Sequence, residues 1–398
     1  MSYPERKRKK TRWSTPHSTP NPSLPDDLLL SIFARVIFAR VSRLYYPTLS
    51  LVSKSFRSLL ASPELYKARS LSANTESCLY VCLRCCSGYR WFTLCRKPDQ
   101  TITNNKERKS SGYALARVPI PGGSPNVRSS SLVAVGSDIY NICGSINKAS
   151  PSSSVSILDC RSHKWREAPS LPVELCSVSA SVLDQKIYVA GCYNQVQGNG
   201  YPDSRKNSFE VLDTKTQIWE TKPVPCCSGR IYNFFNSKST CIDGKFYVVT
   251  EDRGSEVAYN SKEGRWDSKE LGMGGFMFSD SYCEIDNVLY SLSDGAFRWY
   301  DTEVREWKDL NGLFQLPKFS ASACVRLADY GGKMAVLWDQ LPYHYGYQKE
   351  IHCAVVERPT RYEMWGKSCE IWGKVEWCDL MLTVPTSYVL VKVLAATL

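Results

Sequence analysis

The sequence predicts a mainly β protein, a β-propeller of about six blades preceded by a small all-α helical module. Two observations lead to this fold class. From Cys78 onward, the apolar residues change from helical spacing to short strand-like segments separated by Gly, Asp, Asn and Pro turns. A pair of short patterns then recurs four times, with tryptophans 54, 47 and 41 residues apart, and periods near this size are typical of propeller blades.

The composition is that of a folded protein without a membrane span. The chain has 398 residues, of which 43% are hydrophobic and 22% charged, so it can bury a core. No apolar run reaches the roughly 18–20 residues that cross a bilayer, and the best candidate, 28–41, contains Arg35 and Arg40. The N-terminus lacks the apolar segment of a signal peptide, and the 17 cysteines are expected to be reduced thiols.

The positive charge is concentrated at the N-terminus. The formal net charge is +11, and residues 1–12 contribute +5 of it. A nucleic-acid-binding domain carries its positive charge on the folded surface, so this distribution favours a nuclear-import signal over nucleic-acid binding. A merely solubilising tail is an equal alternative. We expect residues 1–23 to be a disordered basic tail, and the protein to reside in the nucleus and/or cytoplasm.

Residues 24–71 are expected to form a module of three short helices. Pro25 and Pro47 suit the first turn of a helix, and the apolar residues from Leu49 to Leu59 have helical spacing. Ser62, followed by Pro and Glu, opens a third helix. A unit of this size can scarcely bury its own apolar faces, so it is expected to need a partner.

Two patterns make up each repeat between residues 129 and 317. In the first, Asp or Gly begins a strand that carries Tyr four residues later, and in the second, Asp or Asn precedes Trp by six residues. The residues expected to be structural are Tyr140, Trp165, Tyr188, Trp219, Tyr247, Trp266, Tyr290 and Trp307. Each copy is expected to be a small antiparallel sheet, and such sheets must stack radially to bury both faces.

The propeller is expected to occupy residues 78–398. Its clear repeats are about 129–172, 173–225, 228–275 and 276–317, with degenerate blades at both ends. The first blade is expected from strands at 79–84, 91–96 and 113–118, and the last from strands at 333–338, 351–356 and 370–377. A spare strand at 388–394 is placed to complete the first blade and close the ring.

Both halves of the chain carry a family resemblance. The segments LPDDLLLSIFARV (24–36) and YPTLSLVSKSFRSLLASPELYKARS (46–70) resemble the F-box. The repeats resemble kelch repeats, whose pattern is an apolar strand, a Gly pair, then Tyr, six residues and Trp. Together they resemble the plant F-box/kelch-repeat protein family over about 24–398. The resemblance implies an F-box that docks the Skp-type adaptor of an SCF-type (cullin-RING) E3 ubiquitin ligase, and a propeller that selects the target protein.

The resemblance and the small size of the module suggest a set of adaptor-binding residues. Its members are Leu24, Pro25, Leu28, Ile32, Leu49, Val52 and Phe56. The alternative is that these side chains form the module's own core, and some are expected to serve both roles.

The chain departs from the family pattern in two places. The kelch Gly pair survives only as Cys143-Gly144 and Gly191-Cys192, so the later blades are expected to turn differently. Ile32–Val36 is followed directly by the same five residues, Ile37–Val41. In a continuous helix, this insertion rotates the downstream residues by about 500° and adds about 7.5 Å, so either one copy loops out or adaptor binding weakens. Weakened binding gives the alternative function, a kelch-propeller interaction scaffold with an impaired F-box.

No catalytic or metal site is expected. Cys82, Cys85 and Cys86 invite a zinc interpretation, but no second pair is found at zinc-site spacing, so buried or half-exposed thiols on a β-blade are favoured. The chain has only 4 histidines, which leaves too few imidazoles for a His/Tyr copper site. It also lacks a Gly-X-Ser-X-Gly or Walker motif. We therefore expect no cofactor, and a protein that is not an enzyme.

The target-binding surface is expected in loops at one face of the propeller. Two loops, 192–208 and 343–348, contain the aromatic residues and arginine that anchor interfaces. The candidate contacts are Tyr193, Tyr201, Arg205, Tyr343 and Tyr345. Loops that are merely long, with no binding role, are the alternative.

Overall fold

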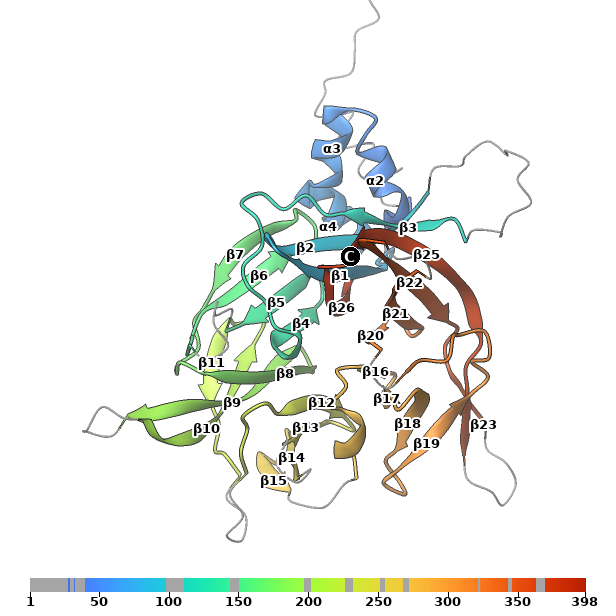
Figure 1. Cartoon of the computed structure of the whole chain (residues 1–398). Helices are drawn as coiled ribbons and strands as arrows, with labels where there is room; N and C mark the ends of the chain where they lie inside the picture. The colour runs from blue at the N-terminus through green and yellow to red at the C-terminus, as the bar shows by residue number, and fades with distance from the viewer. Residues whose placement is uncertain are drawn as a thin grey trace, which may run out of the picture.

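The computed structural model of the chain contains a ring of six β-sheets, with short helices outside the ring beside β2 (Gly88–Arg96) and β3 (Tyr113–Arg117) (Figure 1). It describes residues 28, 32, 40–97, 111–143, 150–196, 202–225, 232–250, 255–267, 272–320, 323–342, 346–362 and 369–398. The prediction of a six-bladed β-propeller behind a small helical module is confirmed. Within these ranges, no helix has the length and apolar character needed to cross a bilayer.

Blade one is completed by the C-terminal strand, which closes the ring. Its innermost strand, β26 (Val389–Thr397), pairs antiparallel with β1 (Ser77–Cys85), as the spare strand at 388–394 predicted. The outer strands of blade one are β2 (Gly88–Arg96) and β3 (Tyr113–Arg117). Blade two contains β4 (Leu132–Val135), β5 (Asp138–Ile142), β6 (Val155–Asp159) and β7 (Lys164–Ala168).

The other four blades follow in chain order. Blade three contains β8 (Ser177–Leu183), β9 (Lys186–Val196), β10 (Pro202–Asp213) and β11 (Ile218–Thr221), and blade four β12 (Lys238–Ile242), β13 (Lys245–Val249), β14 (Glu256–Asn260) and β15 (Arg265–Asp267). Blade five contains β16 (Tyr282–Ile285), β17 (Val288–Ser293), β18 (Ala296–Asp301) and β19 (Glu306–Asn311), and blade six β20 (Val325–Asp329), β21 (Met334–Gln340), β22 (Gln348–Val356) and β25 (Val375–Pro385).

The prediction of a single strand at 370–377 is wrong. Its first part, β24 (Glu370–Trp372), pairs parallel with β19 and, with β23 (Thr360–Tyr362), extends blade five. Its second part begins β25 of blade six. Gly373 separates the two strands in a narrow space, because a Cβ there would lie 2.9 Å from side-chain atoms of Leu313 and Val356.

A two-residue turn between the first and second strands explains the Asp-to-Tyr pattern. Asp184, Asp243 and Asp286 have φ values of 51°, 50° and 49°, and Gly136, with φ of 55°, takes the same place in blade two. Asp, Asn and Gly tolerate this left-handed conformation better than other residues. The Tyr four residues later is buried in each of these blades.

A second repeated turn explains the six-residue spacing to tryptophan. The Asp213 side chain accepts hydrogen bonds from the backbone N–H groups two and three residues further on. The N–H four residues on donates to the Asp213 carbonyl. Asn260 and Asp301 form the same turn. Because the turn has a constant length, Leu212 lies opposite Trp219 and the equivalent pairs align in the other blades.

The repeat tryptophans connect each blade to the preceding one. The indole N–H groups of Trp219, Trp266 and Trp307 donate to the carbonyls of Pro169, Pro223 and Gly272, which lie just after the outer strand of the preceding blade, at 2.8, 2.7 and 3.0 Å. In blade two, Trp165 instead makes an edge contact with Trp91 of blade one, with ring centroids 6.1 Å apart. These contacts occupy the gaps between sheets, where the sequence pattern places them.

The long loop predicted at 192–208 is mostly a β-hairpin. β9 and β10 stay paired up to Val196 and Pro202. Gly191 lies inside β9 rather than in a turn, and its Cβ would be 2.6 Å from the Ser177 carbonyl oxygen, so glycine permits the close approach of β8. Blade five differs at the place of the Gly pair, as expected. There the chain makes a tight turn through Asp294 and Gly295, with φ values of 53° and 75°.

The described helical module begins with a 3-10 helix, η2 (Arg43–Tyr45), and continues with α2 (Tyr46–Leu49), α3 (Lys54–Leu60) and α4 (Pro63–Leu71). Ser62 caps α4 as predicted, because its hydroxyl accepts from the Leu65 N–H. The expectation that one helix continues from Pro47 to Leu59 is wrong. Ser53 adopts an extended conformation, and its hydroxyl caps α3 at the Phe56 N–H, 3.0 Å away.

Candidate protein-interaction surfaces

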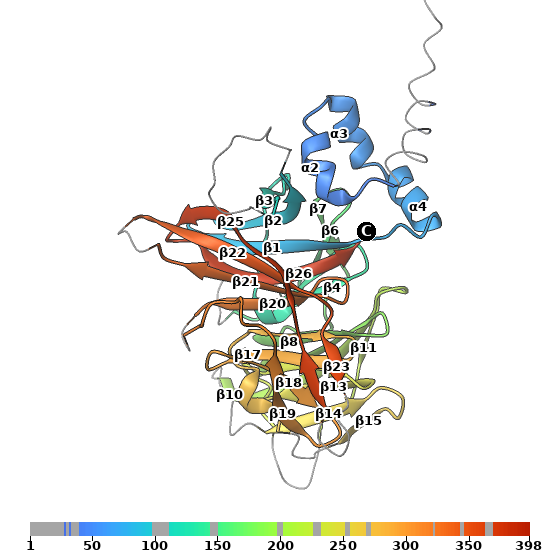
Figure 2. The same cartoon turned by 90° about the vertical axis from the view of Figure 1, so that its right-hand side faces the viewer.

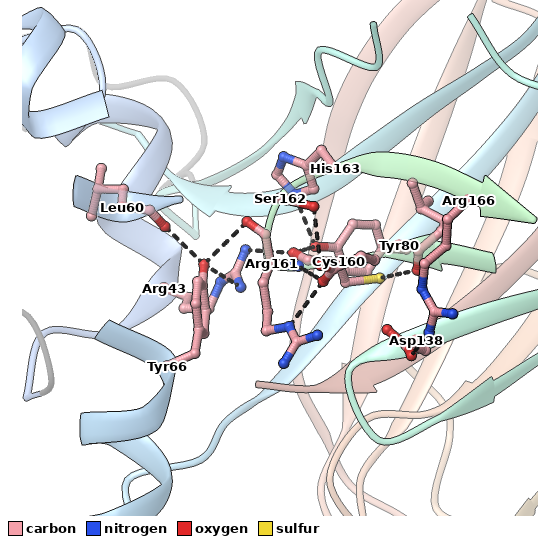
Figure 3. Close-up of polar contacts among 12 residues, drawn as sticks. Arg43, Leu60, Tyr66, Tyr80, Asp138, Cys160, Arg161, Ser162, His163 and Arg166 are labelled. Carbon is pink, nitrogen blue, oxygen red and sulfur yellow. Dashed lines mark hydrogen bonds and ion pairs between the residues drawn. The ribbon is translucent and has the colours of Figure 1, made fainter. Parts of the chain in front are cut away.

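A buried polar cluster joins the helical module to blades one and two (Figure 3). The Arg43 guanidinium donates to the Tyr66 hydroxyl at 2.9 Å and to the Cys160 carbonyl at 3.3 Å. Its central carbon also lies 5.3 Å from the ring centroids of Tyr46 and Tyr66. Because Arg43 is only 8% exposed, its charge depends on these oxygens and aromatic faces. The contacts hold the module in one orientation on the propeller.

The turn between β6 and β7 supplies the propeller side of this cluster. The Tyr80 hydroxyl of β1 lies 2.9 Å from the Cys160 carbonyl and 3.1 Å from Nε2 of His163. Burial lowers the pKa of His163 to about 4, and the nearby Arg43 charge adds to the effect. The imidazole is therefore neutral at physiological pH and adds no charge beside the buried guanidinium.

Arg69 and Glu76 fix the segment between α4 and β1. The Glu76 carboxylate accepts from the Arg43 backbone N–H at 2.8 Å and pairs with Arg69 at 3.4 Å. Arg69, which is 1% exposed, also donates to the Val41 carbonyl at 2.8 Å. The second copy of the repeated pentapeptide ends at Val41, so the end of this copy is anchored in the module. Residues 33–39 of the repeat lie outside the described residues.

The predicted adaptor-binding residues separate into two groups. Leu28, Ile32 and Val52 are exposed by 46%, 44% and 64%. Leu49 and Phe56 instead pack against the module's core, which consists of Tyr46, Leu59, Leu60 and Leu65. Leu24 and Pro25 lie outside the described residues. The role of this set in partner binding stays a prediction.

Two further apolar side chains are strongly exposed on the module. Leu51 and Leu71 are exposed by 78% and 80%. Sequence reasoning missed them, because Leu51 lies in the break between α2 and α3 and Leu71 ends α4, where helical periodicity carries no signal. Like Val52, each of them is available to contact a partner.

The helices and the long connections lie at opposite ends of the propeller. The helices contact the Cys160–His163 turn, which shares one end of the propeller, here called the turn face, with the Asp184–Gln185 turn. β9 starts at that turn and runs to Val196, so the tip of its hairpin lies at the other end, the loop face. In Figure 2, α4 and the tips of β22 and β25 lie on opposite sides of the molecule.

Two of the predicted target contacts are described. Tyr193 is half-buried and packs against the core between blades two and three. Arg205 is exposed, and its guanidinium carbon lies 3.9 Å from the centroid of the Phe235 ring. Tyr201, Tyr343 and Tyr345 lie outside the described residues. Tyr347, which is 93% exposed, is located where the second predicted loop joins β22.

A channel of about 510 Å³ runs along the propeller axis. The innermost strands of all six blades line it, and its wall includes Ser181, Ser239, Glu284, Asp329 and Lys392. Cys82 and Cys85 are buried and Cys86 is exposed, on and beside the β1–β2 hairpin. In the described part of the chain, no three His, Cys, Asp or Glu side chains gather into an arrangement that could hold a metal ion.

Comparison with known proteins matches both halves of this architecture. The F-box domain family matches residues 22–68, and the family described as FKB95, Kelch-repeats domain, matches residues 91–382. The chain belongs to the F-box/kelch-repeat family. The F-box/kelch-repeat protein At3g08810 of Arabidopsis thaliana is 68% identical over 403 residues, with 100% of both chains covered. At5g51250 of the same plant is 59% identical, with 94% of this chain and 100% of its own covered.

The two matches place the buried cluster of this F-box/kelch-repeat protein at a domain boundary. Arg43 and Tyr66 lie within the F-box match, whereas Cys160 and His163 lie within the kelch match. Tyr80 and Glu76 lie between the two matches, in β1 and just before it. The F-box and the propeller are therefore joined by a packed interface as well as by the chain itself.

Proposed function

We propose that this F-box/kelch-repeat protein is the substrate-recruiting subunit of an SCF-type (cullin-RING) E3 ubiquitin ligase. Its F-box docks a Skp-type adaptor, and its kelch propeller binds the target protein. The chain itself contributes no catalytic residue. The basic tail at residues 1–12 directs it to the nucleus, with residence in the cytoplasm as the other compartment of the proposal.

The placement of two surfaces at opposite ends of one packed unit supports this proposal. Arg43 and Tyr66 hold the F-box on the turn face, while Leu51, Val52 and Leu71 stay exposed. Large apolar side chains that stay exposed on so small a module are typical of an interaction site. The described helices η2 to α4 lie away from the loop face, so an adaptor and a target can be held at the same time.

The test is a pull-down of the full chain with a recombinant Skp-type adaptor. Val52→Asp introduces a charge next to the exposed Leu51 and is expected to weaken adaptor binding at least about tenfold. Val304→Asp is the matched control, because Val304 is similarly exposed, at 54%, in the β18–β19 turn of the propeller. Equal loss in both variants, or no binding by the wild-type chain, contradicts the proposal.

A deletion of residues 37–41 distinguishes the ligase subunit from a scaffold with an impaired F-box. Equal adaptor binding by the wild-type and deleted chains means that the repeated pentapeptide leaves the docking surface intact. Binding by the deleted chain alone means that the repeat blocks docking, which supports the scaffold function instead.

A further inference from the structure

A basic cluster adjoins the central channel, which is lined by one of its members, Lys392. Lys238, Arg326 and Lys392 come from the innermost strands of blades four, six and one, and Asp280 is the acidic residue among the charged neighbours of Lys392. Lys238 forms an ion pair with Asp280. Arg326 instead donates to backbone carbonyls, including that of Val391 at 3.0 Å. Three cationic side chains therefore gather around one carboxylate.

Among the residues that the structure describes, the Lys392 ammonium has no hydrogen-bond or ion-pair partner, unlike the other two cations. Its side chain lines the channel. Burial, together with the charges of Arg326 and Lys238, lowers its pKa to about 8. The ammonium is still protonated at neutral pH, and an anion placed beside it is stabilised. The hydroxyls of Ser181 and Ser239, 3.0 Å apart, line the same channel.

The opposite end of the channel is acidic. Glu284 and Asp329 line it, and burial, together with the charge of Asp286, raises the pKa of both. The strand β20 shows this change of charge along the channel, because Arg326 lies near the start of the strand and Asp329 at its end. An anion is therefore attracted to one mouth of the channel and repelled from the other.

The basic cluster lies toward the loop-face end of the channel, here called the basic mouth. The innermost strands of blades two to six begin at the loop face and end at short turns on the turn face, and Lys238 is the first residue of β12. Phe235, three residues earlier, lies under the guanidinium of Arg205 from the β9–β10 hairpin. Arg205 therefore lies beside the entrance, and adds a cation to the rim on the side where the exposed Tyr347 also lies.

We propose that this basic mouth, defined by Lys238, Arg326 and Lys392, receives an acidic side chain of the target protein, while Arg205 contacts the adjoining segment. The inference rests on the proposed function, because it assigns a chemistry to the target. A protein side chain is favoured as the source of the anion because the basic groups continue from the channel onto the loop face. An anchor in a pocket surrounded by rim contacts is the usual arrangement of a protein interface.

The test measures retention of two matched peptide pools on the immobilised full chain. Both pools are randomised around a constant centre, which is Glu-Glu in one pool and Gln-Gln in the other, and succinate is the small-anion probe. We expect the Glu-Glu pool to be retained and the Gln-Gln pool to pass. Lys392→Met should reduce retention at least about tenfold. Lys186→Met is the matched control, because this lysine lies on the turn face in an ion pair with Asp213.

A second variant that is expected to bind more tightly excludes misfolding as the cause of the altered retention. Asp280→Asn removes the carboxylate that pairs with Lys238 and should increase retention of the Glu-Glu pool several-fold. Equal retention of both pools, or an unchanged Lys392→Met variant, overturns the proposal. Binding of succinate without retention of either pool also overturns it, because the anion is then a free small molecule. The assay contains no adaptor, so its failure is distinguishable from a failure of the adaptor pull-down.

Discussion

The two ends of the propeller are built on different principles. On the turn face, the same short turns recur at Asp213, Asn260 and Asp301, and buried contacts of Arg43 hold the F-box there. On the loop face, the connections between the second and third strands vary from the tight turn at Asp294 to the long β9–β10 hairpin. The turn face therefore maintains the architecture, while the connections of the loop face differ from blade to blade, as is usual for loops on a rigid scaffold.

The largest loss of stability is expected at the repeat tryptophans. Trp266 contacts Phe209, Tyr259, Phe234 and Phe246, so Trp266→Ala should lower the free energy of unfolding by about 3–5 kcal/mol. Chemical denaturation of the full chain measures it. Trp372→Ala, at a tryptophan that is 42% exposed in β24, should cost less than about 1 kcal/mol. Similar losses in both variants would contradict the structural role of the repeat pattern.

A smaller loss of stability is expected at the junction between the F-box and the propeller. Arg43→Met removes charged hydrogen bonds to Tyr66 and Cys160 and should cost about 2–3 kcal/mol. It should also speed proteolysis at residues 72–76, which connect α4 to β1. Arg166→Met is the control, because this half-exposed ion pair with Asp138 is expected to contribute less than about 1 kcal/mol. A proteolysis rate like that of wild type would show that the Arg43 contacts do not hold the two domains together.

The stability of this junction should also depend on pH, because His163 titrates at a lower pH in the folded protein than in the unfolded chain. The unfolded chain takes up a proton near pH 6.5, whereas the folded ring resists protonation down to about pH 4, so stability is lost as the pH falls from 6.5 toward 4. After allowance for the partial exposure of the ring, we expect a loss of about 1 kcal/mol at pH 5. Melting temperatures of wild type and His163→Gln across this range isolate the effect. Parallel pH profiles would disprove it.

The smallest effect on stability is expected on the loop face. Arg205 is exposed and contacts Phe235 through its guanidinium, so Arg205→Ala should change the free energy of unfolding by no more than about 0.5 kcal/mol. The same variant should weaken retention of the Glu-Glu peptide pool. If it destabilises the chain as much as Arg43→Met, the proposed division between the two faces is wrong.

Features that depend on neighbouring residues could be predicted from the sequence. The turn at Asp213 needs only the backbone of the next four residues, so the spacing from Asp213 to Trp219 reveals it. The same holds for the start of α4 at Ser62. The ring closure by β26 was predictable because a spare strand and an incomplete blade together leave one arrangement that pairs all edges.

Features that depend on distant residues could not be predicted in this way. Leu49, Val52 and Phe56 have the same helical spacing, yet Val52 is exposed and the other two pack inward, because the Ser53 cap breaks the helix between them. Glu370–Trp372 joins blade five rather than blade six because β19 offers it a free edge. Neither outcome leaves a mark in the local pattern.

The fold class, the family and the tryptophan repeat could all be inferred from the sequence, since they depend on short-range turn geometry and on the periodicity of apolar residues. In contrast, long-range packing settles which apolar side chains of the F-box stay exposed and how Arg43 reaches Cys160. It also brings Lys238 and Arg326 near Lys392, which lines the channel. These residues belong to three blades, and only closure of the ring brings their charges within range of one another.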